Sequence, residues 1–270
     1  MEEIQNIARE TRKDIIKMIS LAGSGHPGGS LSCVEIVVAL YFKIMRHNPK
    51  APNWTDRDRF VLSKGHSVPT VYSVLSRTGY FPRDWLWKLR KIDSNLEGHP
   101  CMRKTPGIEA STGSLGQGLS IVNGMALAGK MDKRDYRVYV LLGDGEIEEG
   151  QIWEASMTTS RYGLDNLCAI LDHNRLQIDD SIKNIKNPYP LAEKWQAFGW
   201  EVVEVDGHNF ADLLNAFAYS KQVKHKPTMI IANTVKGKGV SFMENQLAWH
   251  GKAPTAEQCE LALKEIENQP

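Results

Sequence analysis

The chain has 270 residues, 41% of them hydrophobic and 24% charged, which is the composition of an ordinary globular protein and enough length for one large α/β domain or two small ones. Lysine and arginine number 33 and aspartate and glutamate 32, so the net charge is +1. This balance excludes the strong overall field that favours nucleic acid or a membrane surface, and any bound anion must be held by local groups.

The amino terminus lacks the basic and apolar regions of a signal peptide, and the longest apolar run, Val37 to Phe42, is too short to cross a membrane. We therefore expect a cytoplasmic protein. The cysteines are widely spaced and form no C-x-x-C pair, so we expect reduced thiols rather than disulfides or a zinc site. They are Cys33, Cys101, Cys168 and Cys259.

In chain order, apolar residues at helical spacing predict a helix over residues 2–21, ending at a glycine-rich turn over residues 22–29. Ser32 and Glu35 have the spacing of a capping box, which predicts a second helix starting there. Helical segments separate most of the β-rich runs that follow. These runs are Phe60–Leu62, Arg137–Leu142, Leu167–Asp172, Glu201–Val205 and Thr228–Asn233.

The predicted strands are nearly continuous runs of valine, isoleucine and leucine, which is typical of strands covered on both faces in a parallel sheet. We therefore predict an α/β fold with a doubly wound, mostly parallel sheet flanked by helices. Two stretches, Asp93–Leu119 and Lys236–Thr255, resist assignment and exceed the length of most structureless loops, which favours a functional role.

Five of the eight histidines have a glycine neighbour, far more than composition predicts: His26, His66, His99, His208 and His250. Glycine suits a sharp turn near a ligand, so the set indicates a site built from several loops at the carboxyl ends of the strands. For any one of them, a loop histidine bonded to nearby backbone is an equal alternative. Zinc is not expected, because the spacing and the cysteines do not support it. The remaining His47, His173 and His225 lack special context, and we expect surface or hydrogen-bonded side chains.

An acidic turn, Gly143-Asp144-Gly145, ends the second predicted strand, and Asn174 follows the third. Both lie at the same edge of a parallel sheet, and a single aspartate with an asparagine suits magnesium that already carries a diphosphate. Gly145 could turn its amide toward a phosphate ahead of a helix predicted over residues 146–160. An ordinary glycine-rich turn remains the alternative.

With these residues the chain resembles the thiamine diphosphate enzymes, whose motif is Gly-Asp-Gly followed by a distant asparagine. Among these enzymes, it most resembles the amino-terminal half of transketolase. The matching stretches cover nearly the whole chain in order. They are Ser24–Gly28, Ser63–His66, Glu97–Pro100, Thr112–Gly118, Gly143–Gly145, Glu149–Glu154, Asp172–Asn174, Lys236–Gly239 and Trp249–Gly251.

The resemblance implies a role for individual residues. Magnesium would be bound by Asp144, Asn174 and the Leu176 carbonyl. Cofactor contacts would come from His66, Gly113, Ser114, Leu115, Gly116, Gly145, Glu146 and His250, although Ser114 stands where many relatives have proline. His26, His99 and His250 would take part in catalysis, the first two by handling protons on the sugar hydroxyls. Glu149 and Glu154 would join a carboxylate network across the subunit interface.

The resemblance also implies what the chain lacks. A full transketolase continues through a pyrimidine-binding domain, which supplies the glutamate that activates the cofactor, and then a third domain. Since this chain ends at Pro270, we expect residues 1–270 to form a single diphosphate-binding domain. A carboxy-terminal subunit would complete a two-chain transketolase, which we expect to be a heterotetramer. The enzyme would transfer a two-carbon ketol unit between sugar phosphates, as in the pentose phosphate pathway.

Three alternatives remain open. A related carboligase, such as a deoxyxylulose phosphate synthase, shares the cofactor, but the turn at His26 and the Trp-His-Gly at His250 favour transketolase. A magnesium-dependent phosphohydrolase with Asp144 as nucleophile would need further carboxylates around the metal. A non-catalytic regulatory homologue would have little reason to keep both the metal pair and the histidines.

Overall fold

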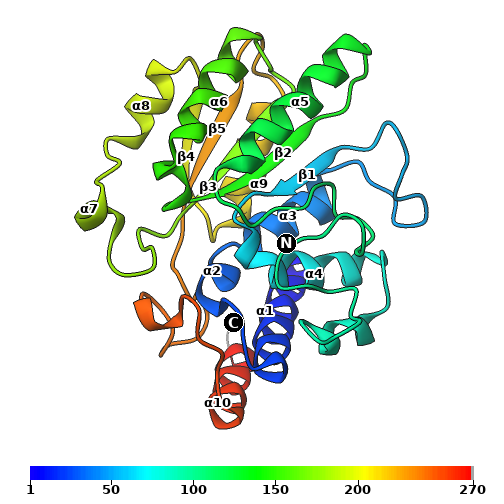
Figure 1. Ribbon diagram of the computed structural model, residues 1–270, viewed down its shortest axis with the longest axis vertical. Helices are drawn as coiled ribbons and strands as arrows, with labels where there is room; N and C mark the ends of the chain where they lie inside the picture. Colours follow the sequence, from blue (N-terminus) through cyan, green and yellow to red (C-terminus); the bar gives the residue numbers. More distant parts are fainter. Residues whose placement is uncertain (269–270) are drawn as a thin grey trace.

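A computed structural model describes residues 1–268 and contains a five-stranded, all-parallel sheet with helices on both faces (Figure 1). The strand order is β1-β2-β3-β5-β4. The predicted α/β fold class is confirmed, and each predicted strand agrees within one residue at either end. The strands are β1 Arg59–Leu62, β2 Val138–Gly143, β3 Leu167–His173, β4 Glu201–Asp206 and β5 Thr228–Asn233.

The continuous apolar character of the central strands follows from the two cores that they separate. Along β2, Tyr139 and Leu141 enter one apolar cluster, whereas Val138 and Val140 enter the other. Successive side chains of a strand point to opposite faces, so a strand buried on both sides needs apolar residues throughout. The prediction that the strands are covered on both faces is wrong for β4, which lies at the edge of the sheet and exposes its Glu204.

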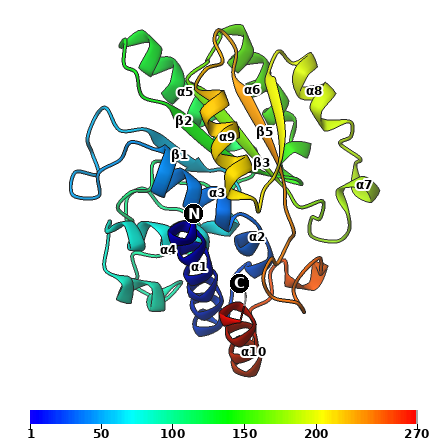
Figure 2. The same ribbon diagram turned by 180° about the vertical axis from the view of Figure 1, so that it is seen from behind.

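Helices cover the two faces in separate layers. In Figure 1, α5 and α6 lie in front of the sheet, and Figure 2 shows α3 and α9 on the other face. Beyond the sheet, α1 packs against α4 and α10. The helices are α1 Glu2–Ala22, α2 Pro27–Ser32, α3 Val34–Ala39, α4 Val68–Thr78, α5 Gln117–Met131, α6 Gly150–Arg161, α7 Ile182–Ile185, α8 Leu191–Ala197, α9 Phe210–Ser220 and α10 Ala256–Glu267.

The predicted capping box at Ser32 and Glu35 is wrong. Ser32 is the last residue of α2, and its hydroxyl donates to the carboxylate of Asp172. Glu35 lies inside α3, where its buried carboxylate pairs with Arg12 at 2.6 Å and with His208 at 2.9 Å. Ser32 and Glu35 therefore bond to residues distant in sequence and not to the backbone at a helix end, as their local spacing had predicted.

The helix predicted over residues 146–160 begins later, at Gly150, after one 3₁₀ turn over Glu146–Glu148. The helix starts later because the carboxylate of Glu146 turns back and accepts hydrogen bonds from the amides of Gly143 and Gly116, each at 3.0 Å. The two unassigned stretches are confirmed as largely irregular loops, with α5 beginning at Gln117 and one 3₁₀ turn over Leu247–Trp249. Within residues 1–268, no helix has the length and apolar character needed to cross a membrane.

Two glycines of α5 provide a matched test of the packing between this helix and the end of β1. An added Cβ at Gly118 would lie 2.2 Å from Oγ and 2.9 Å from Cα of Ser63, whereas at the exposed Gly124 it would meet nothing within 4 Å. We expect Gly118→Ala to lower the free energy of unfolding by ~1–3 kcal/mol through overpacking. Gly124→Ala should raise it by about 1 kcal/mol through helix propensity. Urea unfolding of both variants measures the difference, and equal stabilities would contradict it.

Candidate active site

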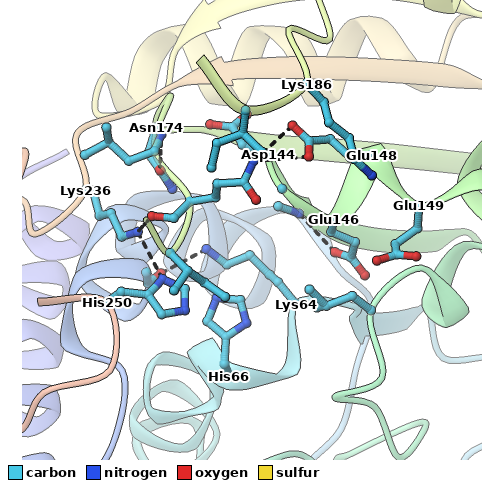
Figure 3. Close-up of a pocket in the computed structure, with 18 residues that line it drawn as sticks. Lys64, His66, Asp144, Glu146, Glu148, Glu149, Asn174, Lys186, Lys236 and His250 are labelled. Carbon is cyan, nitrogen blue, oxygen red and sulfur yellow. Dashed lines mark hydrogen bonds between the residues drawn. The ribbon is translucent and has the colours of Figure 1, made fainter. Parts of the chain in front are cut away.

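A cavity of about 300 Å³ opens at the carboxyl ends of β2 and β3, where several segments distant in sequence converge (Figure 3). Its wall includes the acidic turn, Gly143-Asp144-Gly145, and Asn174, which the sequence predicted to meet there. Lys236 and His250 stand on one side of the cavity in Figure 3, and Glu148 and Glu149 on the other. The residues that line the cavity include Gly29, Lys64, His66, Leu115, Asp144, Gly145, Glu146, Asn174, Leu176, Gln177, Lys236 and His250.

Four of the five glycine-adjacent histidines gather beside this cavity. The ring centroid of His26 lies 5.3 Å from that of His66, 5.5 Å from that of His250 and 6.2 Å from that of His99. His208 does not join them, because its ring bridges the carboxylate of Glu35 and the backbone amide of Val235. Four of the five histidines therefore gather as predicted for a site built from several loops. The prediction is wrong for His208.

The histidines of this cluster are neutral at pH 7. Burial, with neighbouring cations adding to it, lowers the pKa of His26 and of His250 to about 4. Burial also lowers the pKa of His66 and of His99. A neutral imidazole carries one N–H and one lone pair, so it can donate a proton at one nitrogen and accept one at the other. The buried Nδ1 of His26 has no hydrogen-bond partner among residues 1–268.

Two buried lysines supply positive charge to the cavity, and motif spacing alone had assigned them no role. Lys64 pairs with the carboxylate of Asp172 and donates to the Gly29 carbonyl at 2.9 Å. The ammonium of Lys236 lies 3.1 Å from Nδ1 of His250. Burial, followed by repulsion from Lys64, lowers the pKa of Lys236 to about 8, which leaves it mostly protonated at pH 7. Since that ammonium donates to Nδ1, the N–H of His250 is on Nε2.

The acidic turn and the asparagine meet on one wall. The buried carboxylate of Asp144 lies 2.8 Å from Nδ1 of His173 and also accepts the amide of Arg175. Asn174 donates from Nδ2 to Asp172 at 3.2 Å, and its Oδ1 accepts the Leu176 amide at 3.2 Å. Burial raises the pKa of the Asp144 carboxyl. A desolvated carboxylate of this kind is stabilised by a nearby cation.

His173 is a site residue that the sequence analysis missed. The sequence suggested only a surface or hydrogen-bonded histidine. The side chain is buried, and both of its nitrogens are hydrogen-bonded, one to Asp144 and the other to the Tyr189 hydroxyl at 3.2 Å. Its contact with Asp144 makes it a support of the acidic turn. Its place at the last residue of β3, directly before Asn174, was the one available signal.

The residues present fit a magnesium ion and a diphosphate. Asp144, Asn174 and the Leu176 carbonyl offer a carboxylate, an amide oxygen and a carbonyl oxygen, the hard donors that magnesium prefers. Within residues 1–268, no group of three or more His, Cys, Asp or Glu side chains is placed to hold a metal ion. A Cβ on Gly145 would lie 3.1 Å from Gln177, so glycine keeps the backbone open at the cavity.

Of the other residues predicted to contact the cofactor, some line the cavity and others do not. Leu115 lines the cavity, whereas Ser114 is exposed and Gly113 packs against the ring of His99. Gly116 adopts a positive φ of 85° and donates its amide to Glu146. The buried carboxylate of Glu146 also accepts the Ser63 hydroxyl, so it joins three loops, and its contact with a cofactor stays a prediction.

The two acids predicted to reach a subunit interface are exposed in the single chain. Glu149 lies at the rim of the cavity, and Glu154 lies on the outer face of α6, outside the cavity. A position on the surface is compatible with contact to another subunit, and that role stays a prediction.

Comparison with known proteins identifies the family. Residues 4–269 match the family described as transketolase, thiamine diphosphate binding domain. The chain is 45% identical over 266 residues to an apulose-4-phosphate transketolase subunit of Phocaeicola vulgatus, covering 98% of this chain and 94% of that protein. It is also 45% identical over 267 residues to the 6-deoxy-6-sulfo-D-fructose transketolase subunit SqwG of a Clostridium species, covering 99% and 97%.

The fold agrees with solved transketolases. The structure superposes on the transketolase of Campylobacter jejuni with a TM-score of 0.94 at 32% identity, covering 99% of this chain and 43% of that one. The chain thus spans less than half of a transketolase that is a single polypeptide and nearly all of the two subunits named above. From the match along its length and the shared fold, we conclude that the chain belongs to the family of transketolase thiamine diphosphate-binding domains.

Proposed function

We propose that the chain is the diphosphate-binding subunit of a two-chain transketolase that moves a two-carbon ketol unit from a ketose phosphate to an aldose phosphate. The observation that carries the proposal is one cavity lined by Asp144, Asn174, His66 and His250, with the rings of His26 and His99 packed next to these histidines. The partner is proposed because the two relatives are named as subunits and match this chain over almost their whole length. We propose a heterotetramer of two such pairs, in the cytoplasm, with residues 1–270 forming one domain.

Thiamine diphosphate, when bound, supplies the chemistry that breaks and forms a carbon–carbon bond beside a carbonyl group. The chain's own residues would hold it and serve the sugar. Asp144, Asn174 and the Leu176 carbonyl would bind magnesium, and Lys64 and Lys236 would balance the remaining negative charge of the diphosphate.

The histidines divide into two groups by position. His66 and His250 line the cavity itself, His250 with its N–H on Nε2, and we propose that they donate hydrogen bonds to the cofactor. His26 and His99 are not among the lining residues; the ring of His26 lies 5.3 Å from that of His66 and 6.2 Å from that of His99, and we propose that these two histidines move protons on the sugar hydroxyls. Because burial lowers the pKa of His26 to about 4, its neutral ring carries one N–H and one lone pair at pH 7 and could give a proton at one nitrogen and take one at the other.

The identity of the sugars stays open within this proposal. The two relatives are named for an apulose phosphate and for a sulfonated fructose, so the pentose phosphate pathway is one candidate setting. Assay of the assembled enzyme with ketose phosphates, with product identification by mass spectrometry, tests the proposal. Deoxyxylulose phosphate formed from pyruvate would instead show the related carboligase.

We expect His26→Ala and His99→Ala to lower turnover by ~10²–10⁴, the usual contribution of general acid–base catalysis, while leaving cofactor affinity largely unchanged. His66→Ala and His250→Ala should also weaken cofactor binding, because these rings line the cavity. Steady-state rates and calorimetry on the same preparations separate the two effects. His208→Ala is the matched control, since its ring lies outside the cluster. Loss of activity in all four variants only through a lowered unfolding temperature would contradict these roles.

A further inference from the structure

The most heavily hydrogen-bonded carboxylate near the cavity belongs to Asp172, a residue to which the proposed function assigns no role. It lies in β3, its side chain is fully buried, and four side chains from four segments donate to it. Oδ1 accepts the Thr234 hydroxyl, and Oδ2 accepts the three other donors. These donors are the Ser32 hydroxyl, the Lys64 ammonium and Nδ2 of Asn174.

The contact with Asn174 determines how that side chain is turned. An ionised carboxylate only accepts hydrogen bonds, so the group 3.2 Å from Asp172 Oδ2 must be the NH₂ of the asparagine. The amide oxygen is then on the opposite branch, where it accepts the amide of Leu176 at 3.2 Å. Asn174 and Leu176 both line the cavity. Rotation of the amide by 180° would set its oxygen against the carboxylate and its NH₂ against an N–H donor.

Charge makes this arrangement stable. Lys64 and Asp172 form an ion pair whose side chains are only 2% and 0% exposed. Lys64 donates to Oδ2 of Asp172, the same oxygen that accepts from the Asn174 amide. The ion pair therefore fixes the position of the oxygen against which the Asn174 NH₂ lies.

We propose that Asp172 is a positioning residue that orients Asn174, so that the asparagine presents its oxygen, and not its NH₂, to the cation of the cofactor. The inference rests on the proposed function, because it assumes a magnesium ion at Asn174. Groups that orient a metal ligand are typically worth ~10–100-fold in metal affinity.

A swap of the two side chains tests the inference. Asn174→Asp places two carboxylates against each other, and although an aspartate is by itself the stronger magnesium ligand, we expect magnesium-dependent cofactor affinity to fall by ~10–100-fold. Asp172→Asn combined with Asn174→Asp restores an amide-to-carboxylate hydrogen bond and the original buried charge, and it should recover most of the loss. Thr234→Val, which removes a donor to the same carboxylate without touching Asn174, should leave the cation dependence unchanged.

The measurement is calorimetric affinity for thiamine diphosphate with and without magnesium, on the full chain together with its partner, alongside the unfolding temperature. If Asn174→Asp binds as tightly as the wild type or tighter, or if the folded double variant is no better than Asn174→Asp, the positioning role is overturned while the proposed function stands. If Asn174→Asp does not fold, the charge-balanced double variant decides in the same way against the wild type. A wild-type protein with no magnesium-dependent binding would overturn both the inference and the proposed function.

Discussion

Replacement of Asp144 by alanine is expected to abolish magnesium-dependent binding of thiamine diphosphate. Asp144 is the only carboxylate in the proposed ligand set, and the other two members, Asn174 and the Leu176 carbonyl, are neutral. Without it, the charge that attracts the cation to this wall is lost, while His173 and the Arg175 amide lose their acceptor. We expect the magnesium-dependent affinity to fall by more than ~100-fold, beyond what the loss of an outer contact costs.

Calorimetry on the assembled protein, with magnesium varied at fixed cofactor, measures this effect. Glu148→Ala is the matched control, because Glu148 also lines the cavity but donates no proposed ligand and instead accepts from Gln177 at 3.1 Å. The control should keep the cation dependence of the wild type. An Asp144→Ala protein that binds the cofactor as the wild type does would remove the cation site from the proposal.

The chain alone is expected to show no ketol transfer, and addition of its partner should restore the reaction. In the proposed function, the cavity binds the diphosphate end of the cofactor through a magnesium ion and two lysines, and the partner supplies the carboxylate that activates the other end. The surface carries exposed apolar side chains, Ile178 and Ile185 at the cavity, Met157 on α6 and Tyr162 directly after it. Large obligate interfaces are usually apolar, so we also expect the chain alone to self-associate or to be poorly soluble.

Mixing experiments measure this dependence. The purified chain, thiamine diphosphate and magnesium are assayed with a ketose phosphate donor and an aldose acceptor, with and without a cognate pyrimidine-domain chain. The same mixture made with the Asp144→Ala chain is the control for activity carried by the partner itself. Robust turnover by the chain with no second polypeptide detectable by mass spectrometry would refute the two-chain proposal.

Local sequence was sufficient for most of the fold because the relevant signals are local. Strands buried on both faces require unbroken apolar runs, so all five were found within one residue of their ends, and only β4, at the sheet edge, departs in burial. The position of the acidic turn could also be predicted, since Gly143-Asp144-Gly145 comes at the end of an apolar run and parallel strands end at one edge. The transketolase resemblance rested on the same short motifs.

What the amino-acid sequence determined by itself is thus the order of the elements, the parallel sheet, the edge where the site lies and the family. Tertiary structure alone decided which side chains meet there. It gave Ser32 and Glu35 buried partners in place of a helix cap, separated His208 from the other four histidines, and paired Asp172 with Lys64, which lines the cavity. These pairings join residues far apart in the chain. Their energies depend on burial and charge at the contact. A local pattern of residues therefore cannot predict which distant residue a side chain will contact.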